Sequence, residues 1–152
     1  AITDYSMKNR TYRYLESEPL YPFGYGLSYT QFRYFDATAE YTEAGWSVSV
    51  TIENTGRFCG EEVVQVYLKD LESRYAVRNH ALCAFGRVCL APGEKKQLTL
   101  PIREKAFEIV DEQGQRRLDS HCFRIFVGGS QPDPRSCSLM GTAPLELTIT
   151  RE

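Results

Sequence analysis

Apolar and polar residues alternate with a period of two along most of this chain after residue 30. The clearest run covers residues 46–53 and ends at an Asn-Thr-Gly turn. The apolar positions that share one face of this run are Trp46, Val48, Val50 and Ile52. Because successive side chains of a β-strand point to opposite sides, this alternation predicts a strand with one buried face.

A second run, at residues 62–69, is apolar on both faces. Val64, Val66 and Leu68 form the main apolar face, and Val63 and Tyr67 lie on the other. A strand with two apolar faces is covered on both sides. The sequence therefore predicts that this strand lies in the middle of a sheet.

Further short runs with strand character follow, separated by turn residues such as Ala-Pro-Gly and Gln-Gly. No run has a helical period. Many short strands with turn signals between them favour an antiparallel β-sandwich of the immunoglobulin or fibronectin type III-like kind. The further predicted strands are 81–90, 97–102, 107–110, 115–119, 122–127, 136–140 and 145–150.

The first thirty residues show no steady alternation. Residues 18–30 alone contain two prolines, two glycines and four aromatics, a composition that suits neither a helix nor a strand. We expect this irregular N-terminal extension, residues 1–30, to pack its aromatics against another surface, whereas residues 31–152 form the sandwich. The docking candidates are Tyr12, Tyr14, Tyr21, Phe23, Tyr25 and Tyr29.

The composition fits one soluble globular domain and excludes two classes of partner. The chain has 152 residues, of which 42% are hydrophobic and 25% charged. Its formal net charge of −2 argues against nucleic acid, which calls for a basic face. No apolar run approaches the roughly 20 residues that a membrane span needs, so no membrane partner is predicted.

Five cysteines are scattered along the chain without a CxxC pair, so we expect no metal site. Cys83, Cys89 and Cys122 lie within apolar strand patterns, where a cysteine is expected to be a small buried hydrophobe. An odd number of cysteines favours a reducing compartment, and the expected localisation is cytoplasmic.

Carboxylate pairs could in principle supply an acid and a base. Glu61 and Glu62 are adjacent and point to opposite faces of a strand, and Asp111 and Glu112 lie beside a glycine turn. We therefore expect these residues, and Asp119, to have surface roles.

The two histidines, His80 and His121, are far apart in the chain, and no GxSxG elbow or glycine-rich phosphate loop accompanies them. Ordinary surface or hydrogen-bonded histidines are expected. The sequence predicts no catalytic residue and no cofactor.

The longest connection between predicted strands covers residues 70–79. Sandwich loops project at the ends of the sheets, where they can meet a ligand or a neighbouring domain. Arg74, Tyr75 and Arg78 are the candidates for substrate binding in this loop. A solvated charged loop is the other interpretation.

The motif PFGYGLSYT at residues 22–30 resembles the segment that leads into the C-terminal fibronectin type III-like domain of family 3 glycoside hydrolases. These are enzymes of the β-glucosidase and β-xylosidase type. The match continues in chain order, which makes it specific. The further matching segments are 50–56, 60–67, 82–94 and 123–133, and residues 10–14 resemble the linker from the preceding α/β domain.

The resemblance implies an accessory role without chemistry of its own. The catalytic aspartate of the family lies in an N-terminal barrel and its acid/base residue in the α/β domain, and neither motif is found in this chain. The implied partners are these two domains of the same parent polypeptide, which cleaves terminal β-linked sugars. Separately from the resemblance, the length and charge of the loop at 70–79 suggest that it extends to the rim of the parent's active site.

The alternative is a carbohydrate-binding module that uses exposed tyrosines on polymeric substrate. Against it, the tyrosines lie in an irregular segment better suited to docking on protein. An immunoglobulin-like adhesion domain is disfavoured, because the ordered glycosidase motifs would have no reason to occur there.

Overall fold

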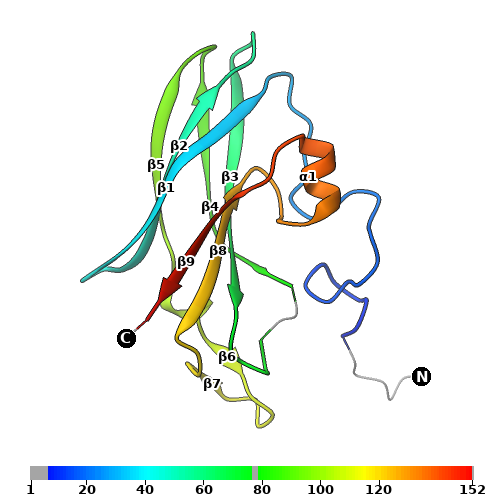
Figure 1. Ribbon diagram of the computed structural model, residues 1–152, viewed down its shortest axis with the longest axis vertical. Helices are drawn as coiled ribbons and strands as arrows, with labels where there is room; N and C mark the ends of the chain where they lie inside the picture. Colours follow the sequence, from blue (N-terminus) through cyan, green and yellow to red (C-terminus); the bar gives the residue numbers. More distant parts are fainter. Residues whose placement is uncertain (1–6, 77–78, 152) are drawn as a thin grey trace.

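Two antiparallel sheets face each other in the computed structural model, which describes residues 7–76 and 79–151 (Figure 1). The first sheet has the order β1-β2-β5, with β1 at Phe32–Thr42, β2 at Gly45–Asn54 and β5 at Lys95–Pro101. The second has the order β4-β3-β8-β9, with β3 at Gly60–Asp70, β4 at Ala81–Leu90, β8 at Cys122–Gly128 and β9 at Leu145–Thr150. The all-β fibronectin type III-like sandwich expected from the sequence is confirmed.

The smaller elements lie between β5 and β8 and between β8 and β9. A short 3-10 turn, η1, covers Glu104–Ala106. The hairpin of β6 (Ile109–Val110) and β7 (Arg116–Arg117) occupies the lower end of the sandwich in Figure 1. The helix α1 covers Pro134–Met140.

The core lies between the inward faces of the two sheets. Val48, Val50 and Ile52 of β2 are fully buried, as the period-two pattern predicts. They belong to the same apolar cluster as Val64 and Val66 of β3, whose central position between β4 and β8 is also confirmed. Burying one such side chain stabilises the fold by roughly 1.5–3 kcal/mol, so these strands hold the sheets together.

The predicted strand at 136–140 is wrong, and so is the expectation that no helix occurs. This stretch lies in α1, where the carboxylate of Asp133 caps the first turn by accepting a hydrogen bond from the Ser136 N–H at 2.9 Å. Pro134 occupies the first turn, and Gly141 ends the helix with a left-handed φ of 70°. In the sequence, only these capping residues indicate the helix, because seven residues are too few to show a helical period.

The strand β1 has no counterpart among the predicted strands. Its pairing with β2 shifts register between Phe35 and Thr38, and Asp36 has a φ of 53° inside this bulge. A bulge inserts an extra residue and thereby breaks the alternation that marks a strand. The sequence pattern at this position is therefore interrupted even though the strand continues.

A buried asparagine at the end of β2 connects both sheets. The Asn54 amide donates hydrogen bonds to the carbonyl oxygens of Phe58 at 2.7 Å and Leu90 at 2.9 Å. Its carbonyl oxygen accepts from the Thr30 hydroxyl at 2.7 Å and from the Gly56 N–H at 3.0 Å. We call these five residues the Asn54 clamp.

A second buried polar contact crosses between the sheets. The Tyr34 hydroxyl of β1 donates to the Glu62 carboxylate of β3 at 2.5 Å, and Glu62 is buried. Burial raises the pKa of Glu62 more than the Tyr34 hydrogen bond lowers it. The expectation of a surface role for Glu62 is wrong, whereas Glu61 is exposed and pairs with Arg87.

Replacing Asn54 by alanine is expected to destabilise the fold by about 3 kcal/mol, because it leaves several buried polar groups without a partner. Urea unfolding followed by circular dichroism would measure this change in the free energy of unfolding. Ser49→Ala is the matched control: it removes a solvent-accessible cross-strand hydrogen bond to Thr99 and should cost about 0.5 kcal/mol. Equal losses in the two variants would contradict the central role of the clamp.

Glu62→Gln is expected to stabilise the fold at pH 7 and to lose this advantage as the pH falls toward 4. The raised pKa means that the folded state binds the Glu62 proton more tightly than the unfolded chain, whose carboxyl titrates near the ordinary value of 4.5. The contribution of the protonated carboxyl is thus present below that pH and is lost as the pH rises through the folded-state pKa. Urea unfolding at several pH values would test this, with the exposed Glu61→Gln as control, and a pH-independent difference would refute it.

Candidate functional site

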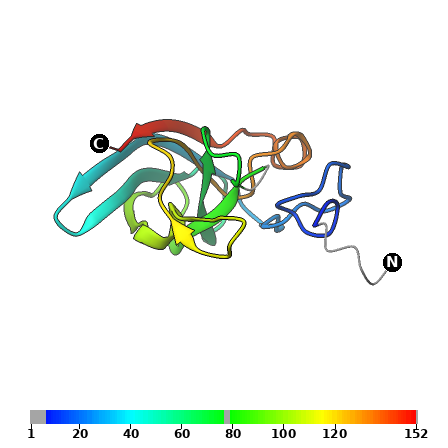
Figure 2. The same cartoon turned by 90° about the horizontal axis from the view of Figure 1, so that it is seen from below.

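The N-terminal segment lies beside the sandwich, next to α1 (Figures 1 and 2). We call its described part, residues 7–30, the strap; the first six residues of the predicted extension lie outside the described residues. The amide of Asn79 holds the strap by donating to the carbonyl oxygens of Tyr12 at 3.1 Å and Leu15 at 3.2 Å. The backbone N–H of Asn79 also donates to the Arg13 carbonyl at 3.3 Å.

A second connection holds the middle of the strap against the outer face of β3. The Gln65 amide donates to the carbonyl oxygens of Gly24 and Gly129, both at 2.9 Å, while its own oxygen accepts from the Tyr67 hydroxyl at 2.7 Å. Gly24 has a φ of 80°, and a Cβ there would lie 2.1 Å from the Gln65 side chain. Only glycine fits this close approach.

The predicted docking residues divide into two groups. Tyr12, Tyr14 and Tyr25 are half-buried within this chain. Tyr12 stacks on Phe23 with ring centroids 4.2 Å apart, and its hydroxyl accepts from the Leu82 N–H at 3.4 Å. Tyr12 therefore has a structural role in this chain, and its docking role stays a prediction.

The other docking candidates, Tyr21, Phe23 and Tyr29, are exposed to solvent. Two leucines of the same segment are exposed with them: Leu20, and Leu27 with 91% of its surface accessible. Tyr29 is 97% accessible. Several large apolar side chains are therefore exposed on one segment, a pattern typical of interaction surfaces.

A groove of about 800 Å³ adjoins this surface. One wall is formed by residues 24–28 and the start of β1, another by β3, and a third by the end of α1 from Leu139 onward. The buried pair of Tyr34 and Glu62 lies among the lining residues. The groove thus offers both apolar and polar contacts beside Leu27.

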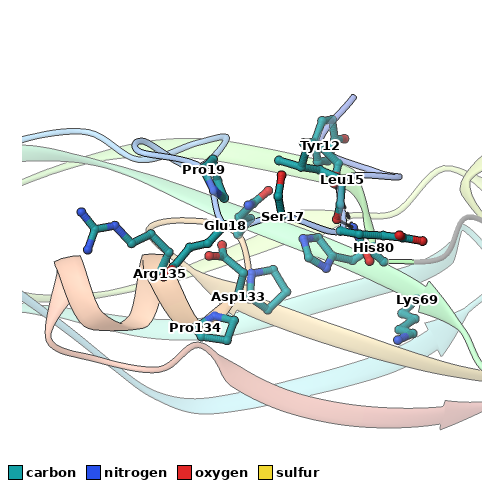
Figure 3. A pocket seen from close by; sticks show the side chains of 14 residues that line it. Tyr12, Leu15, Ser17, Glu18, Pro19, Lys69, His80, Asp133, Pro134 and Arg135 are labelled. Atoms are coloured by element: carbon teal, nitrogen blue, oxygen red, sulfur yellow. Dashed lines mark hydrogen bonds between the residues drawn. The ribbon is translucent and has the colours of Figure 1, made fainter. Parts of the chain in front are cut away.

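A second cavity of about 510 Å³ lies between the strap and the sandwich (Figure 3). The strap contributes residues 15–19, and the sandwich contributes Lys69, His80 and residues 131–135. Figure 3 shows His80 and Asp133 on one side and Ser17 and Glu18 on the other. Charges of both signs line the cavity, so it has no bias toward a cationic or anionic ligand.

Two polar side chains of this cavity are almost completely buried. His80 is 7% and Gln131 5% accessible, and within the described residues neither His80 Nε2 nor Gln131 Oε1 has a well-aligned hydrogen-bond partner. Burial lowers the pKa of His80 and outweighs the opposing contacts of Gln131 and Asp133, so the ring is neutral at pH 7. Of the two expected roles, a surface position is wrong for His80, which is buried and packs edge-on against Tyr67.

The loop at 70–79 is fixed at its start. The Asp70 carboxylate accepts from the backbone N–H groups of Glu72 and Ser73, at 2.9 and 3.0 Å, and from the Ser120 hydroxyl at 2.7 Å. The guanidinium groups of Arg74 and Arg117 lie over the Tyr75 ring, 4.6 and 5.6 Å from its centroid. The Tyr75 ring thus already has two cationic neighbours.

Of the other candidates in this loop, Arg74 is exposed, and Arg78 lies outside the described residues. Their role in substrate binding stays a prediction. Among residues 7–76 and 79–151 no three histidine, cysteine or acidic side chains gather where they could hold a metal ion. No helix in the same ranges has the length and apolar character needed to cross a membrane.

Comparison with known proteins identifies the family to which part of this chain is similar. Residues 62–131 match the model of the fibronectin type III-like domain. The chain thus contains a fibronectin type III-like domain. The resemblance to the corresponding domain of family 3 glycoside hydrolases is thereby confirmed, since the relatives of the domain are β-glucosidases and β-xylosidases.

Two curated relatives illustrate the similarity. The domain is 37% identical over 130 residues to thermostable beta-glucosidase B of Acetivibrio thermocellus, covering 80% of this chain and 17% of that protein. It is 35% identical over 123 residues to a beta-xylosidase of Formosa agariphila, covering 78% of this chain and 17% of that protein. The domain thus spans about a fifth or less of the length of these relatives.

Solved structures agree with this assignment. The domain superposes on the β-glucosidase of Chaetomella raphigera with a TM-score of 0.80 and 26% identity, covering 93% of this chain and 22% of that one. For the β-glucosidase of Listeria innocua the TM-score is 0.72 and the identity 31%, with 90% of this chain and 18% of that one covered.

The sequence did not identify the residues that hold the strap. Gln65 stands at an outward position of β3, where a polar residue is normally solvated, and Asn79 lies in a charged loop. Both act on backbone groups more than forty positions away, so no local pattern reveals them. Gly24 is the one local signal, because a glycine between aromatics suggests a close backbone approach.

Proposed function

We propose that this domain is a non-catalytic accessory domain of a glycoside hydrolase that cleaves terminal β-linked sugars, and that its strap docks on the catalytic domains of the same polypeptide. The supporting observation is the exposed apolar surface of Leu20, Tyr21, Leu27 and Tyr29, which is held in place by Asn79 and Gln65. The partial coverage of the relatives supports a larger polypeptide.

The proposed docking stabilises the catalytic domains by removing apolar surface from water. Leu27 and Tyr29 expose almost their whole side chains, and full burial of a leucine side chain is worth roughly 1.5–3 kcal/mol. The groove beside Leu27 would receive side chains of the partner domain. The proposal includes the loop at 70–79, whose Arg74, Tyr75 and Arg78 would lie at the rim of the active site.

A cytoplasmic location also belongs to this proposal. It is supported by five cysteines that are all free in the structure.

The double substitution Leu27→Ser and Tyr29→Ser tests the docking proposal. In the isolated domain the melting temperature should not change, because both side chains are exposed. In the polypeptide that carries the catalytic domains, we expect a shorter half-life of aryl β-glycosidase activity at elevated temperature. The isolated domain itself should show no such activity.

Tyr41→Ser is the matched control, since Tyr41 is also exposed but lies at the far end of β1, away from the strap. An unchanged half-life for the double variant, or the same loss for Tyr41→Ser, would contradict docking through the strap. Turnover by the pure isolated domain would contradict a non-catalytic role.

The second candidate function is carbohydrate binding, and the cavity in Figure 3 favours it. His80 Nε2 and Gln131 Oε1 are buried polar atoms without an aligned partner within the described residues, and sugar hydroxyls could satisfy both. The neighbouring ring of Tyr12 adds an apolar wall.

Calorimetry with cello-oligosaccharides and with soluble xylan separates the two functions. If the domain is a carbohydrate-binding module using this cavity, saturable heat is expected for the wild type and at least tenfold weaker binding for His80→Ala. Tyr75→Ala should behave as the wild type, because Tyr75 does not line this cavity. Absence of binding in all three proteins would leave docking on protein as the function.

A further inference from the structure

Two exposed thiols meet at the open end of the β3–β4 hairpin. Cys59 Sγ and Cys89 Sγ are 3.8 Å apart, and both residues are exposed. The expectation that Cys89 is buried is therefore wrong. The alternation along β4 explains this, because its neighbours Val88 and Leu90 point into the core and Cys89 must point outward.

The register of the hairpin explains why the thiols come together. Gly60 pairs with Leu90 and Glu61 with Cys89, so Cys59 is the diagonal neighbour of Cys89 on the outer face. Diagonal neighbours within a regular ladder are too far apart for a disulfide. Cys59, however, lies just outside β3 in the connection from β2, and this position allows its thiol to approach.

We propose that Cys59 and Cys89 are a redox modification site that forms a reversible intramolecular disulfide across the open end of the β3–β4 hairpin. The other end of this hairpin is joined by residues 71–80. The disulfide would therefore close β3 and β4 into a ring and prevent β4, an edge strand, from separating at its free end.

The oxidation requires an acceptor for two electrons, and a low-molecular-weight disulfide such as glutathione disulfide supplies it. One thiolate attacks glutathione disulfide, which releases one glutathione, and the second thiolate displaces the other glutathione. Two S–H bonds are lost and one S–S bond forms in the protein, while two glutathione thiols are produced. Neighbouring Cys59, Glu61 and Glu94 raise the pKa of Cys89, so exchange becomes faster as the pH rises.

The other thiols differ in ways that provide controls. Burial raises the pKa of Cys83 to about 12, and its Sγ lies 3.2 Å from the Val66 carbonyl oxygen, so it should not react. Cys122 and Cys137 are half-buried, and within the described residues neither has another cysteine sulfur in contact.

Incubation of the purified chain with glutathione disulfide at pH 8, followed by alkylation and mass spectrometry, tests the proposal. Trypsin cleaves beside Arg57 and Arg87, so Cys59 and Cys89 fall on separate peptides, 58–69 and 88–95. The expected result is one disulfide-linked pair of these peptides. The melting temperature of the oxidised chain should rise, on the order of 5 °C, and return on addition of dithiothreitol.

Cys59→Ser and Cys89→Ser should each abolish both the linked peptides and the rise, whereas Cys122→Ser should retain them. Circular dichroism verifies that each variant is folded. The proposal would be overturned if Cys59 and Cys89 were recovered as separate glutathione adducts, as disulfides between two chains, or unmodified. An equal rise in Cys59→Ser would overturn it as well.

Discussion

The side-chain amide of Asn54 joins four groups that come from separate parts of the chain. It bonds to the carbonyl oxygens of Phe58 and Leu90, the N–H of Gly56 and the hydroxyl of Thr30, and it has no accessible surface. The bonds to Thr30 and Leu90 are buried, and an apolar residue at this position would leave these two groups without a partner, at a cost of roughly 1–3 kcal/mol each. Closure of the sandwich and placement of the strap thus depend on the same side chain.

The strap is fixed at three points, and this determines what it can do. Asn79 holds its first turn, Gln65 holds Gly24, and the Asn54 clamp holds Thr30. Between the last two points the chain presents Leu27 and Tyr29 to solvent in a fixed position. A surface that is ordered before binding loses less conformational entropy on docking, so in the proposed docking the polar anchors would contribute to binding without contacting the partner.

The sequence predicts those structural features that are determined by neighbouring residues in the chain, and it does not predict those that depend on distant partners. The alternation of apolar and polar residues predicted the strands at 145–150 and 46–53 with nearly correct bounds, because a period of two follows from burial of one strand face. The strand β1 was not predicted, because the bulge at Asp36 interrupts its alternation. The helix α1 was not predicted either, because it is too short to show a helical period and only its capping residues indicate it. The roles of the polar residues in the site could not be predicted from the sequence. Gln65, His80 and Glu62 acquire these roles from partners distant in the chain.

The cysteine pair extends the Asn54 clamp from the core to the surface. Phe58 and Leu90, whose carbonyl oxygens accept from Asn54, are the immediate neighbours of Cys59 and Cys89. The amide therefore joins these two backbone segments from the inside, where water is excluded, and the two thiols meet on the solvent side. A disulfide between Cys59 and Cys89 would hold these two segments together, and the Asn54 amide would become exposed only if they separated. Oxidation at the surface would thus strengthen the same closure that also positions Thr30 and the strap.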